Sequence, residues 1–488
     1  MSRSLNISSG MTLKTKQIFH TKKKRKRNNV TWQNILPFLM RHRKDKVRVI
    51  ETQFLDSYPP APPRTRPFQN DFVNEQTLLM SNNDPESFHC AIGSILVLAQ
   101  LFGILPVSGI CSPSPLQLKF VKFSFRTIYT IFISVLVLIM AILSVVHMIK
   151  TLNSVTFEVK GGVGAATAGA MFYSNCLIST LIFFRLSPRW TTLQRDWRSM
   201  EQFIDSNKME RPKLRLKFIV ISASILLLAV GEHILSIIVN TKKYDWSGKS
   251  KNSTFQNFLE IYCMSSHAFI LDSLTYNFTL GIFIFIVSKL ATFTWNFTDV
   301  FIMLISTGLA ERYKTLNKHV MSSISKHRTA DWCGLREDYA VLSCMVKKVD
   351  SDICAIILLS FANNLYFICL QLLNGLSKPA EGILHDIYFF GSFMFLIIRT
   401  VIVTLLTSRI HDQSKVILPL LYTCSASSYN VETERLIYLL TTDDIVLTGM
   451  RFFSITRNFM LAVAGAIVTY EVVLLQFNIA MTPNKNNE

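Results

Sequence analysis

The chain has 488 residues, of which 50% are hydrophobic and only 17% are charged. Soluble domains carry about 25% charged residues, so this composition indicates a polytopic membrane protein and argues against a secreted disulfide scaffold, a coiled coil or a disordered regulator. The net charge of +19 is compatible with a nucleic-acid binder, but 16 of the 51 Lys and Arg residues precede residue 91 and most others lie in loops between apolar stretches. We therefore expect no nucleic-acid partner.

Residues 1–87 are predicted to form a basic, proline-containing cytoplasmic tail. Residues 22–27 read KKKRKR, and residues 58–63 read YPPAPP. The basic run resembles a nuclear-localisation signal, but beside several membrane spans it favours attraction to anionic membrane lipid. The proline run is typical of an extended linker.

Eight stretches are apolar and nearly or fully long enough to cross a bilayer, which takes about 20 residues. They lack the alternation of a barrel strand, so we expect helices. The stretches are 91–111, 125–148, 165–186, 216–240, 263–289, 352–376, 383–408 and 455–477. The first is short and contains Gln100, Gly103 and Pro106. Region 88–124 is therefore predicted to be an apolar helix and turn that does not cross.

The distribution of basic residues supports this choice. If 91–111 does not span and the N-terminus is cytoplasmic, 8 of the 51 Lys and Arg residues lie outside and 43 inside. If it spans, the two sides hold 24 and 27, and the bias disappears. The positive-inside rule therefore predicts an all-α membrane protein of seven transmembrane helices, with a cytoplasmic N-terminus and an extracellular C-terminus.

In this arrangement, residues 125–289 hold spans 1–4, residues 352–408 hold spans 5 and 6, and residues 455–477 form span 7, followed by an extracellular tail at 478–488. Asn252 lies in an Asn-Ser-Thr sequon of an outer loop, where a glycan could be attached. The nine cysteines are scattered, so no disulfide framework is expected; a bridge between Cys263 and Cys369 stays an alternative.

Residues 290–351 and 409–454 are predicted to be cytoplasmic helical extensions that pack on one another as an anchor or assembly domain. Apolar residues recur there at helical spacing, for example over 295–303 and 431–440. The chain has none of the zincin, Walker A, nucleophile-elbow or dinucleotide-binding patterns. We therefore expect no enzyme activity, no metal site and no cofactor.

Ionisable and amide side chains at membrane depth are the main candidates for a site, because charge there is costly unless it faces water or a partner. Those predicted near the outer side occur with aromatic residues, which suits a ligand rich in hydroxyl groups. The alternative is that they form ordinary interhelical hydrogen bonds. The candidate ligand-binding residues are Tyr173, Glu232, His233, His267, Asp272, Tyr276, Asn363, Asn364, Gln371, His385 and Asp386.

The seventh span carries a stripe of small and polar residues on one helical face: Ala462, Ala466, Thr469, Val473 and Gln476. Tyr470 and Phe477 lie beside it. Such a stripe can line a permeation path or can be a packing seam, and spacing alone does not separate the two.

Residues 469–477 (TYEVVLLQF) resemble the TYhhhhhQF signature, where h is hydrophobic, that ends the last helix of insect gustatory receptors. Glu471 departs from it at the first h. Residues 88–93, 101–109 and 295–303 look like the sugar-receptor branch of that family. The resemblance extends over about residues 85–480.

This resemblance implies a tetrameric, ligand-gated, non-selective cation channel related to insect odorant receptors, in the plasma membrane of gustatory neurons. Four copies of the last helix would surround the pore, with Gln476 and Phe477 at the gate and Thr469, Tyr470 and Val473 along it. The ligand would be a mono- or disaccharide in an outward-facing pocket. Either identical chains or related receptors would form the tetramer.

Two other functions stay open at this stage. A G-protein-coupled receptor would need an extracellular N-terminus, which the charge distribution opposes. A sugar transporter would also have an outer polar site, and only the presence of sugar-evoked current without sugar uptake would exclude it.

Overall fold

A computed structural model describes residues 84–154, 162–205, 211–244, 254–271, 274–325, 331–377, 382–424 and 429–481. Over these residues the fold is helical, with one two-stranded hairpin. The elements are α3 (Phe88–Leu101), η2 (Pro115–Gln117), α4 (Phe125–Ser154), α5 (Gly162–Asp205), α6 (Leu214–Asn240), α7 (Phe255–Ser266), α8 (Ala268–Leu271), α9 (Phe278–Ser325), α10 (Trp332–Ser377), α11 (Ile383–Lys415), α12 (Leu418–Tyr422), α13 (Val431–Thr442), β1 (Thr448–Gly449), β2 (Phe453–Ser454) and α14 (Arg457–Met481).

Six of the described helices are long and apolar enough to cross a membrane: α4, α5, α6, α9, α10 and α11. The last long helix, α14, has 25 residues, or about 37 Å at 1.5 Å per residue. That length also crosses a hydrocarbon core of about 30 Å, so α14 is the seventh transmembrane helix. Helix α3 has only 14 residues and is too short to span, as the sequence predicts.

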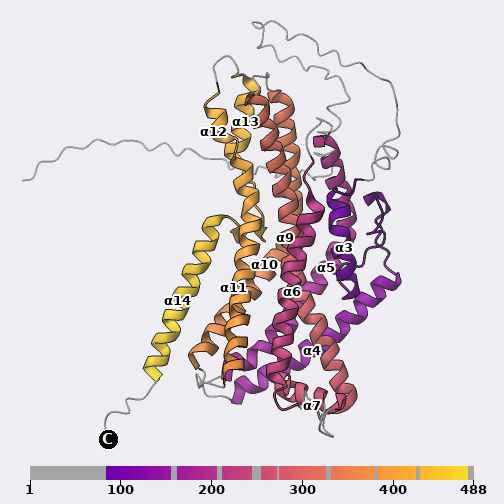
Figure 1. The fold of residues 1–488 in the computed structure, drawn as a ribbon, viewed down its shortest axis with the longest axis vertical. Helices are drawn as coiled ribbons and strands as arrows, with labels where there is room; N and C mark the ends of the chain where they lie inside the picture. The colour runs from indigo at the N-terminus through magenta and orange to yellow at the C-terminus, as the bar shows by residue number, and fades with distance from the viewer. Residues whose placement is uncertain are drawn as a thin grey trace, which may run out of the picture. The chain divides into compact units, whose positions relative to one another are not determined.

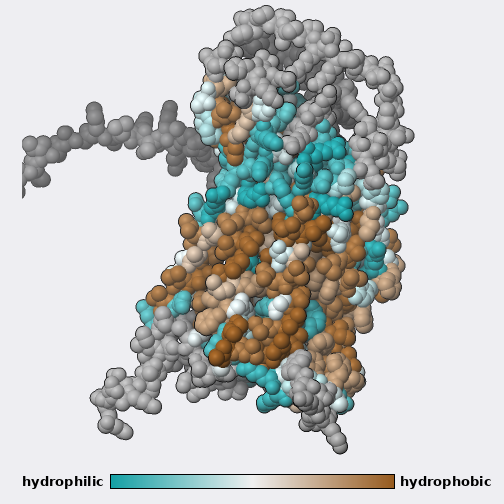
Figure 2. Space-filling view, viewed as in Figure 1, coloured by the Kyte–Doolittle hydropathy of each residue, from teal (hydrophilic) through white to brown (hydrophobic). Residues whose placement is uncertain are grey.

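Helices α9 and α10 are much longer than a bilayer is thick. They contain 48 and 46 residues, or about 70 Å each. They lie side by side with α11, and α12 and α13 lie at one end of these helices (Figure 1). Hydrophobic residues form a broad band around the middle of the long helices, and hydrophilic residues cover the end near α13 (Figure 2). Only the hydrophobic part of each helix is therefore suited to contact with lipid.

At the hydrophilic end, helices from the two predicted cytoplasmic extensions are in contact. Arg336 of α10 is paired with Glu432 of α13 at 2.6 Å. Asp350 of α10 accepts a hydrogen bond from the backbone N–H of Thr448, the first residue of β1, at 2.6 Å. The hairpin turn needs Gly449, because a Cβ there would lie 2.3 Å from the Phe453 ring. Which side of the membrane this end faces stays a prediction.

The short helix α3 is held in place by aromatic packing and a buried carboxylate. The Phe88 ring stacks on Trp197 of α5 with centroids 3.7 Å apart, and it meets Phe218 of α6 edge-on. The backbone N–H of Phe88 donates to Glu201 at 3.1 Å, so an otherwise unpaired donor in the first turn of the helix is satisfied. Glu201 is also paired with Arg312 of α9 at 2.9 Å.

The region predicted as a fourth span over 263–289 differs from a single helix. It contains the end of α7, the four-residue α8, and the start of α9 at Phe278. Helix α7 ends where the backbone N–H of His267 donates to the Cys263 carbonyl at 2.9 Å. Helix α9 begins where the side chain of Asn277 accepts from the backbone N–H of Leu280 at 2.7 Å. Polar end residues break an apolar run that hydropathy alone reads as continuous.

Candidate functional site

One group of candidate residues lies between α5, α6, α7 and α9. The Tyr173 hydroxyl is 2.9 Å from Nε2 of His267, and both side chains are buried. Lys289, which is not among the predicted site residues, donates from Nζ to His233 Nε2 at 2.6 Å and to the Tyr262 hydroxyl at 3.1 Å. This lysine also lies over the Tyr262 ring, 4.7 Å from its centroid. The group is therefore a polar cluster faced by aromatic rings.

A second group joins α6, α10 and α11. Ser392 donates to the Glu232 carboxylate at 3.0 Å, and Gln371 donates from Nε2 to the Ser392 hydroxyl at 3.2 Å. Since Glu232 and His233 are consecutive residues of α6, this group lies beside the first one along that helix. Ser392 supplies the contact between the two predicted residues and was not itself predicted.

A third group is centred on a buried ion pair. Arg399 of α11 lies 2.9 Å from the Asp299 carboxylate of α9, and their side chains are 2% and 0% exposed. Asn364 of α10 donates to Asp299 at 3.0 Å and accepts from Arg399 at 3.2 Å. Three helices are therefore locked together by one network.

Further side chains enclose this ion pair. Ser360 donates to Asp299, and Arg399 donates to Asn296. The Trp295 indole N–H donates to the Asn364 side-chain oxygen at 3.1 Å, and the Arg399 guanidinium lies over the Trp295 ring, 4.6 Å from its centroid. Asp299 is not among the predicted site residues, because residues from 290 onward are predicted to form the cytoplasmic extension. The unpaired Arg399 within an apolar span was the signal that a carboxylate had to be near.

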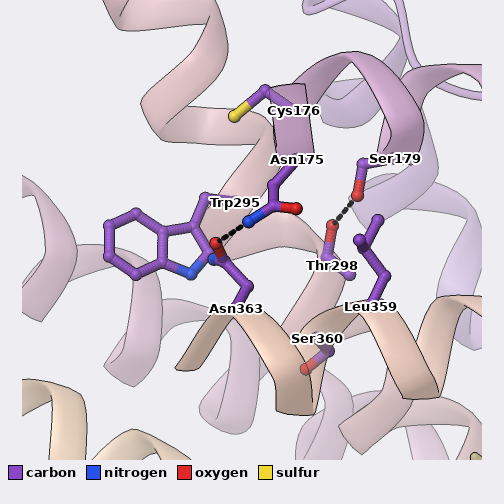
Figure 3. A pocket seen from close by; sticks show the side chains of 8 residues that line it. All are labelled: Asn175, Cys176, Ser179, Trp295, Thr298, Leu359, Ser360 and Asn363. Atoms are coloured by element: carbon purple, nitrogen blue, oxygen red, sulfur yellow. Dashed lines mark hydrogen bonds between the residues drawn. The ribbon is translucent and has the colours of Figure 1, made fainter. Parts of the chain in front are cut away.

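A small cavity lies between α5, α9 and α10, next to the third group. Figure 3 shows Asn175 directed at Asn363 across it, with a hydrogen bond of 2.6 Å, and Ser179 directed at Thr298, with one of 3.2 Å. Its volume is about 10 Å³, which is room for about one water molecule. The packing around it leaves no room for a sugar ring.

Two of the predicted residues hold buried polar atoms without a hydrogen-bond partner. They are Nδ1 of His267 and Oε1 of Gln371. A buried polar atom left unpaired costs about 1–3 kcal/mol, so these two atoms are favoured positions for a ligand hydroxyl or a water molecule.

The remaining predicted ligand residues are not brought into these groups by the described contacts. Tyr276 is half-buried and its hydroxyl donates to the Gln256 carbonyl at 3.4 Å. His385 is half-buried and Asp386 is exposed, both in the first turn of α11. Asp272 and Asn252 lie outside the described residues, and so does the side chain of Phe477. Cys263 and Cys369 are free, so the alternative bridge between them is absent.

Helix α14 has an unusual surface for an apolar helix. None of its side chains from Arg457 to Val473 is buried, and Gln476 is exposed. Near its start, Phe459 stacks on Phe453 with centroids 4.6 Å apart and meets Phe361 of α10 edge-on. Farther along, Thr469 and Val473 are exposed, whereas Tyr470 is half-buried.

Among the described residues, no cluster of three or more His, Cys, Asp or Glu side chains has the arrangement of a metal site. The arrangement defines a seven-helix membrane fold with polar, aromatic-lined clusters between its helices. The comparison with solved structures gives the same fold. The chain superposes on the insect olfactory receptor OR5 of Machilis hrabei with TM-score 0.60, covering 79% of this chain and 97% of that one at 13% identity. The same receptor in complex with eugenol gives TM-score 0.58 at 14% identity.

Sequence comparison identifies the family. The trehalose receptor family model matches residues 65–486. The gustatory receptor for sugar taste 64f of Drosophila melanogaster is 30% identical over 84% of this chain and 87% of its own length. The gustatory receptor 5a for trehalose of the same species is 31% identical over 80% and 85%, respectively. The chain belongs to the trehalose receptor family of sugar gustatory receptors, which confirms the resemblance seen in the sequence.

Proposed function

We propose that this protein is a sugar-gated, non-selective cation channel of the plasma membrane of gustatory neurons. The observation that carries the proposal is family membership over most of the chain, with relatives named for sugar taste and for trehalose. The ligand is a mono- or disaccharide, and the protein acts as a receptor without enzyme activity.

The sugar binds among spans 2 to 6, where the polar clusters lie. Ring faces of Tyr173, Tyr262 and Trp295 suit the apolar C–H faces of a sugar. The unpaired His267 Nδ1 and Gln371 Oε1 suit its hydroxyl groups, and Asp272, Tyr276, His385 and Asp386 are candidates at the outer rim.

Sugar binding requires the helices to separate, because the cavity beside Asn363 holds about one water molecule. The bound and unbound states then differ in how α5, α9 and α10 pack. A ligand shifts such an equilibrium only by its differential affinity for the two states. A sugar that fits only the open pocket binds the separated state better, and this difference in affinity drives gating.

Helix α14 lines the pore of a homo- or heterotetramer. Its exposed face carries Thr469, Val473 and Gln476, and an apolar helix with so little cover in one chain needs either lipid or further subunits around it. Gln476 and Phe477 form the gate, and Tyr470 lies along the pore.

Whole-cell recording from cells that express this chain, against a sugar panel, tests the proposal. Tyr173→Phe removes one hydroxyl from the pocket and is expected to shift the sugar dose response about fivefold to higher concentration, the value of one hydrogen bond. Tyr313→Phe is the matched control: it removes a buried hydroxyl, 3.1 Å from Ser343, at the far end of α9. Equal shifts in both variants would contradict the pocket, and sugar uptake without current would contradict the channel.

A further inference from the structure

A groove lies on the surface between the end of α3 and the first turns of α4. Its volume is about 340 Å³, and its walls include Gln100, Leu101, Phe125, Arg126 and Tyr129. It is separate from the polar clusters of the sugar site, because α3 and the turn after it supply one wall.

The position of this groove along the bundle is set by the two helices that form it. Tyr129, one turn into the membrane-crossing α4, donates its hydroxyl to the Leu101 carbonyl at 2.7 Å. Phe102 stacks on Phe293 of α9 with centroids 3.6 Å apart. The end of α3 therefore lies level with the first turns of a transmembrane helix, at the boundary between headgroups and hydrocarbon.

Arg126 is fixed over the groove by its neighbours. One guanidinium nitrogen, Nη1, donates to Gln100 Oε1 at 2.6 Å and to the Val107 carbonyl at 2.9 Å. Gln100 is itself held, since its Nε2 donates to the carbonyls of Leu105 and Val107 at 3.0 and 2.6 Å. These contacts leave the other guanidinium nitrogens, Nε and Nη2, for a partner, and a guanidinium matches the geometry of a phosphate.

The charge of the chain segment that forms the groove and its surroundings favours an anion. The sequence from residue 87 to residue 157 contains no Asp or Glu, while Lys119, Lys122 and Arg126 all lie there and are exposed. The basic side chains alternate with exposed Phe123 and Phe125, which are 90% and 83% exposed. Aromatic residues at this level insert among lipid chains, and basic pockets between transmembrane helices bind anionic headgroups.

We propose that this groove binds one anionic phospholipid of the inner leaflet, with its phosphate on Arg126 and its acyl chains along Phe123, Phe125 and Leu101. The proposal rests on the predicted orientation of the bundle, and binding is measured without any current, so its failure is distinguishable from failure of the channel function.

The test uses the purified full-length protein in detergent micelles and fluorescent phosphatidylserine. Arg126→Gln and, separately, Lys122→Gln are each expected to raise the apparent Kd about fivefold, the value of one basic residue at an anionic surface. Lys242→Gln is the matched control, an exposed lysine just after α6, and it is expected to leave the Kd unchanged.

Fluorescent phosphatidylcholine and soluble glycerophosphoserine identify what is recognised. Weaker binding of phosphatidylcholine supports recognition of the negative headgroup, and weak competition by glycerophosphoserine supports a lipid over a free phosphate. Equal affinity of wild type and of both the Arg126 and Lys122 variants, or competition by glycerophosphoserine as strong as by the lipid, would overturn the proposal. Should Arg126→Gln fail to fold, Lys122→Gln still decides it, because Lys122 is exposed and does not support the turn after α3.

Discussion

The guanidinium of Arg399 and the carboxylate of Asp299 lie 2.9 Å apart on α11 and α9, and neither side chain is more than 2% exposed. Both belong to spans that face lipid elsewhere on their surface. An ion pair in such a place holds two helices in one register, because sliding either helix would leave a charge unpaired in a low dielectric.

Removing one member of this pair is expected to destabilise the protein more than removing both. Arg399→Leu leaves a buried carboxylate without its cation, at a cost of about 3–5 kcal/mol. The double variant Arg399→Leu with Asp299→Leu removes both charges and is expected to recover part of that loss. The monodisperse yield and thermal stability of a fluorescent fusion in detergent measure the difference. A double variant less stable than either single variant would mean that the hydrogen bonds of Asn364 and Ser360 matter more than the charges.

The sequence predicts most helices of this fold because bilayer thickness imposes a long apolar run on each span. The predicted range 216–240 and the observed α6, Leu214–Asn240, agree closely. The short α3 was also predicted, since Gln100 and Gly103 interrupt its apolar run. What hydropathy does not detect is a helix end inside such a run. At Asn277 the signal was a capping side chain, and a search for caps would have divided the stretch.

The site was predicted only in part, because the sequence does not show which side chains meet in the folded bundle. Sequence periodicity places Glu232, His267 and Asn364 at membrane depth, but which partner each meets depends on how helices rotate in the bundle. Asp299 and Lys289 were missed although both lie on α9. Each is a charged residue on a helix long and apolar enough to cross a membrane. A buried charge needs a partner, so Arg399 alone predicts a carboxylate on a neighbouring helix.

The close approach of α3 to α9 predicts opposite effects for two glycine substitutions. A Cβ at Gly308 would lie 2.8 Å from the Phe88 ring, whereas a Cβ at Gly231 in α6 would have nothing within 4 Å. Gly308→Ala is therefore expected to destabilise the protein by about 1–3 kcal/mol through overpacking. Gly231→Ala is expected to stabilise it by about 0.5–1 kcal/mol, the helix preference for alanine. Thermal unfolding of both variants in detergent measures the effects, and similar values would show that α3 moves aside without cost.

His89 predicts a dependence of stability on pH. Its side chain is buried in α3 and its Nε2 lies 3.0 Å from the Ser112 carbonyl. Burial lowers the pKa of this imidazole below its usual 6.5, an effect that the backbone hydrogen bond to Ser112 opposes. The unfolded chain therefore binds the proton first as the pH falls, and stability present above pH 6.5 is lost below it.

The measurement is the midpoint of thermal unfolding between pH 7.5 and 5.5 for wild type and His89→Gln. Each unit by which the pKa is lowered corresponds to about 1.4 kcal/mol of stability. Wild type is expected to lose more stability over this interval than the variant, which has no titrating group at that position. Parallel curves for the two proteins would assign the acid sensitivity to other histidines.

Two adjacent residues test whether α14 lines the pore, because they are similarly exposed in a single chain. Val472 and Val473 are 47% and 42% exposed, yet successive helical residues point about 100° apart. In the proposed tetramer the two differ, because Val473 lies on the stripe toward the axis and Val472 is turned away from it. Val473→Cys is therefore expected to make sugar-evoked current sensitive to a cationic thiol reagent, and Val472→Cys is expected to leave it insensitive.

Wild type is the control for the native cysteines, of which Cys111 and Cys333 are exposed. A cationic reagent enters only a hydrated path, because charge is costly in lipid. Block at position 473 would therefore show that this residue faces water, and that the helix face shared with Gln476 does so too. The rate of block should rise in the presence of sugar, when the pore is open. Equal block at positions 472 and 473 would mean that α14 is surrounded by water on both faces, and block at 472 alone would rotate the pore-lining face away from the stripe.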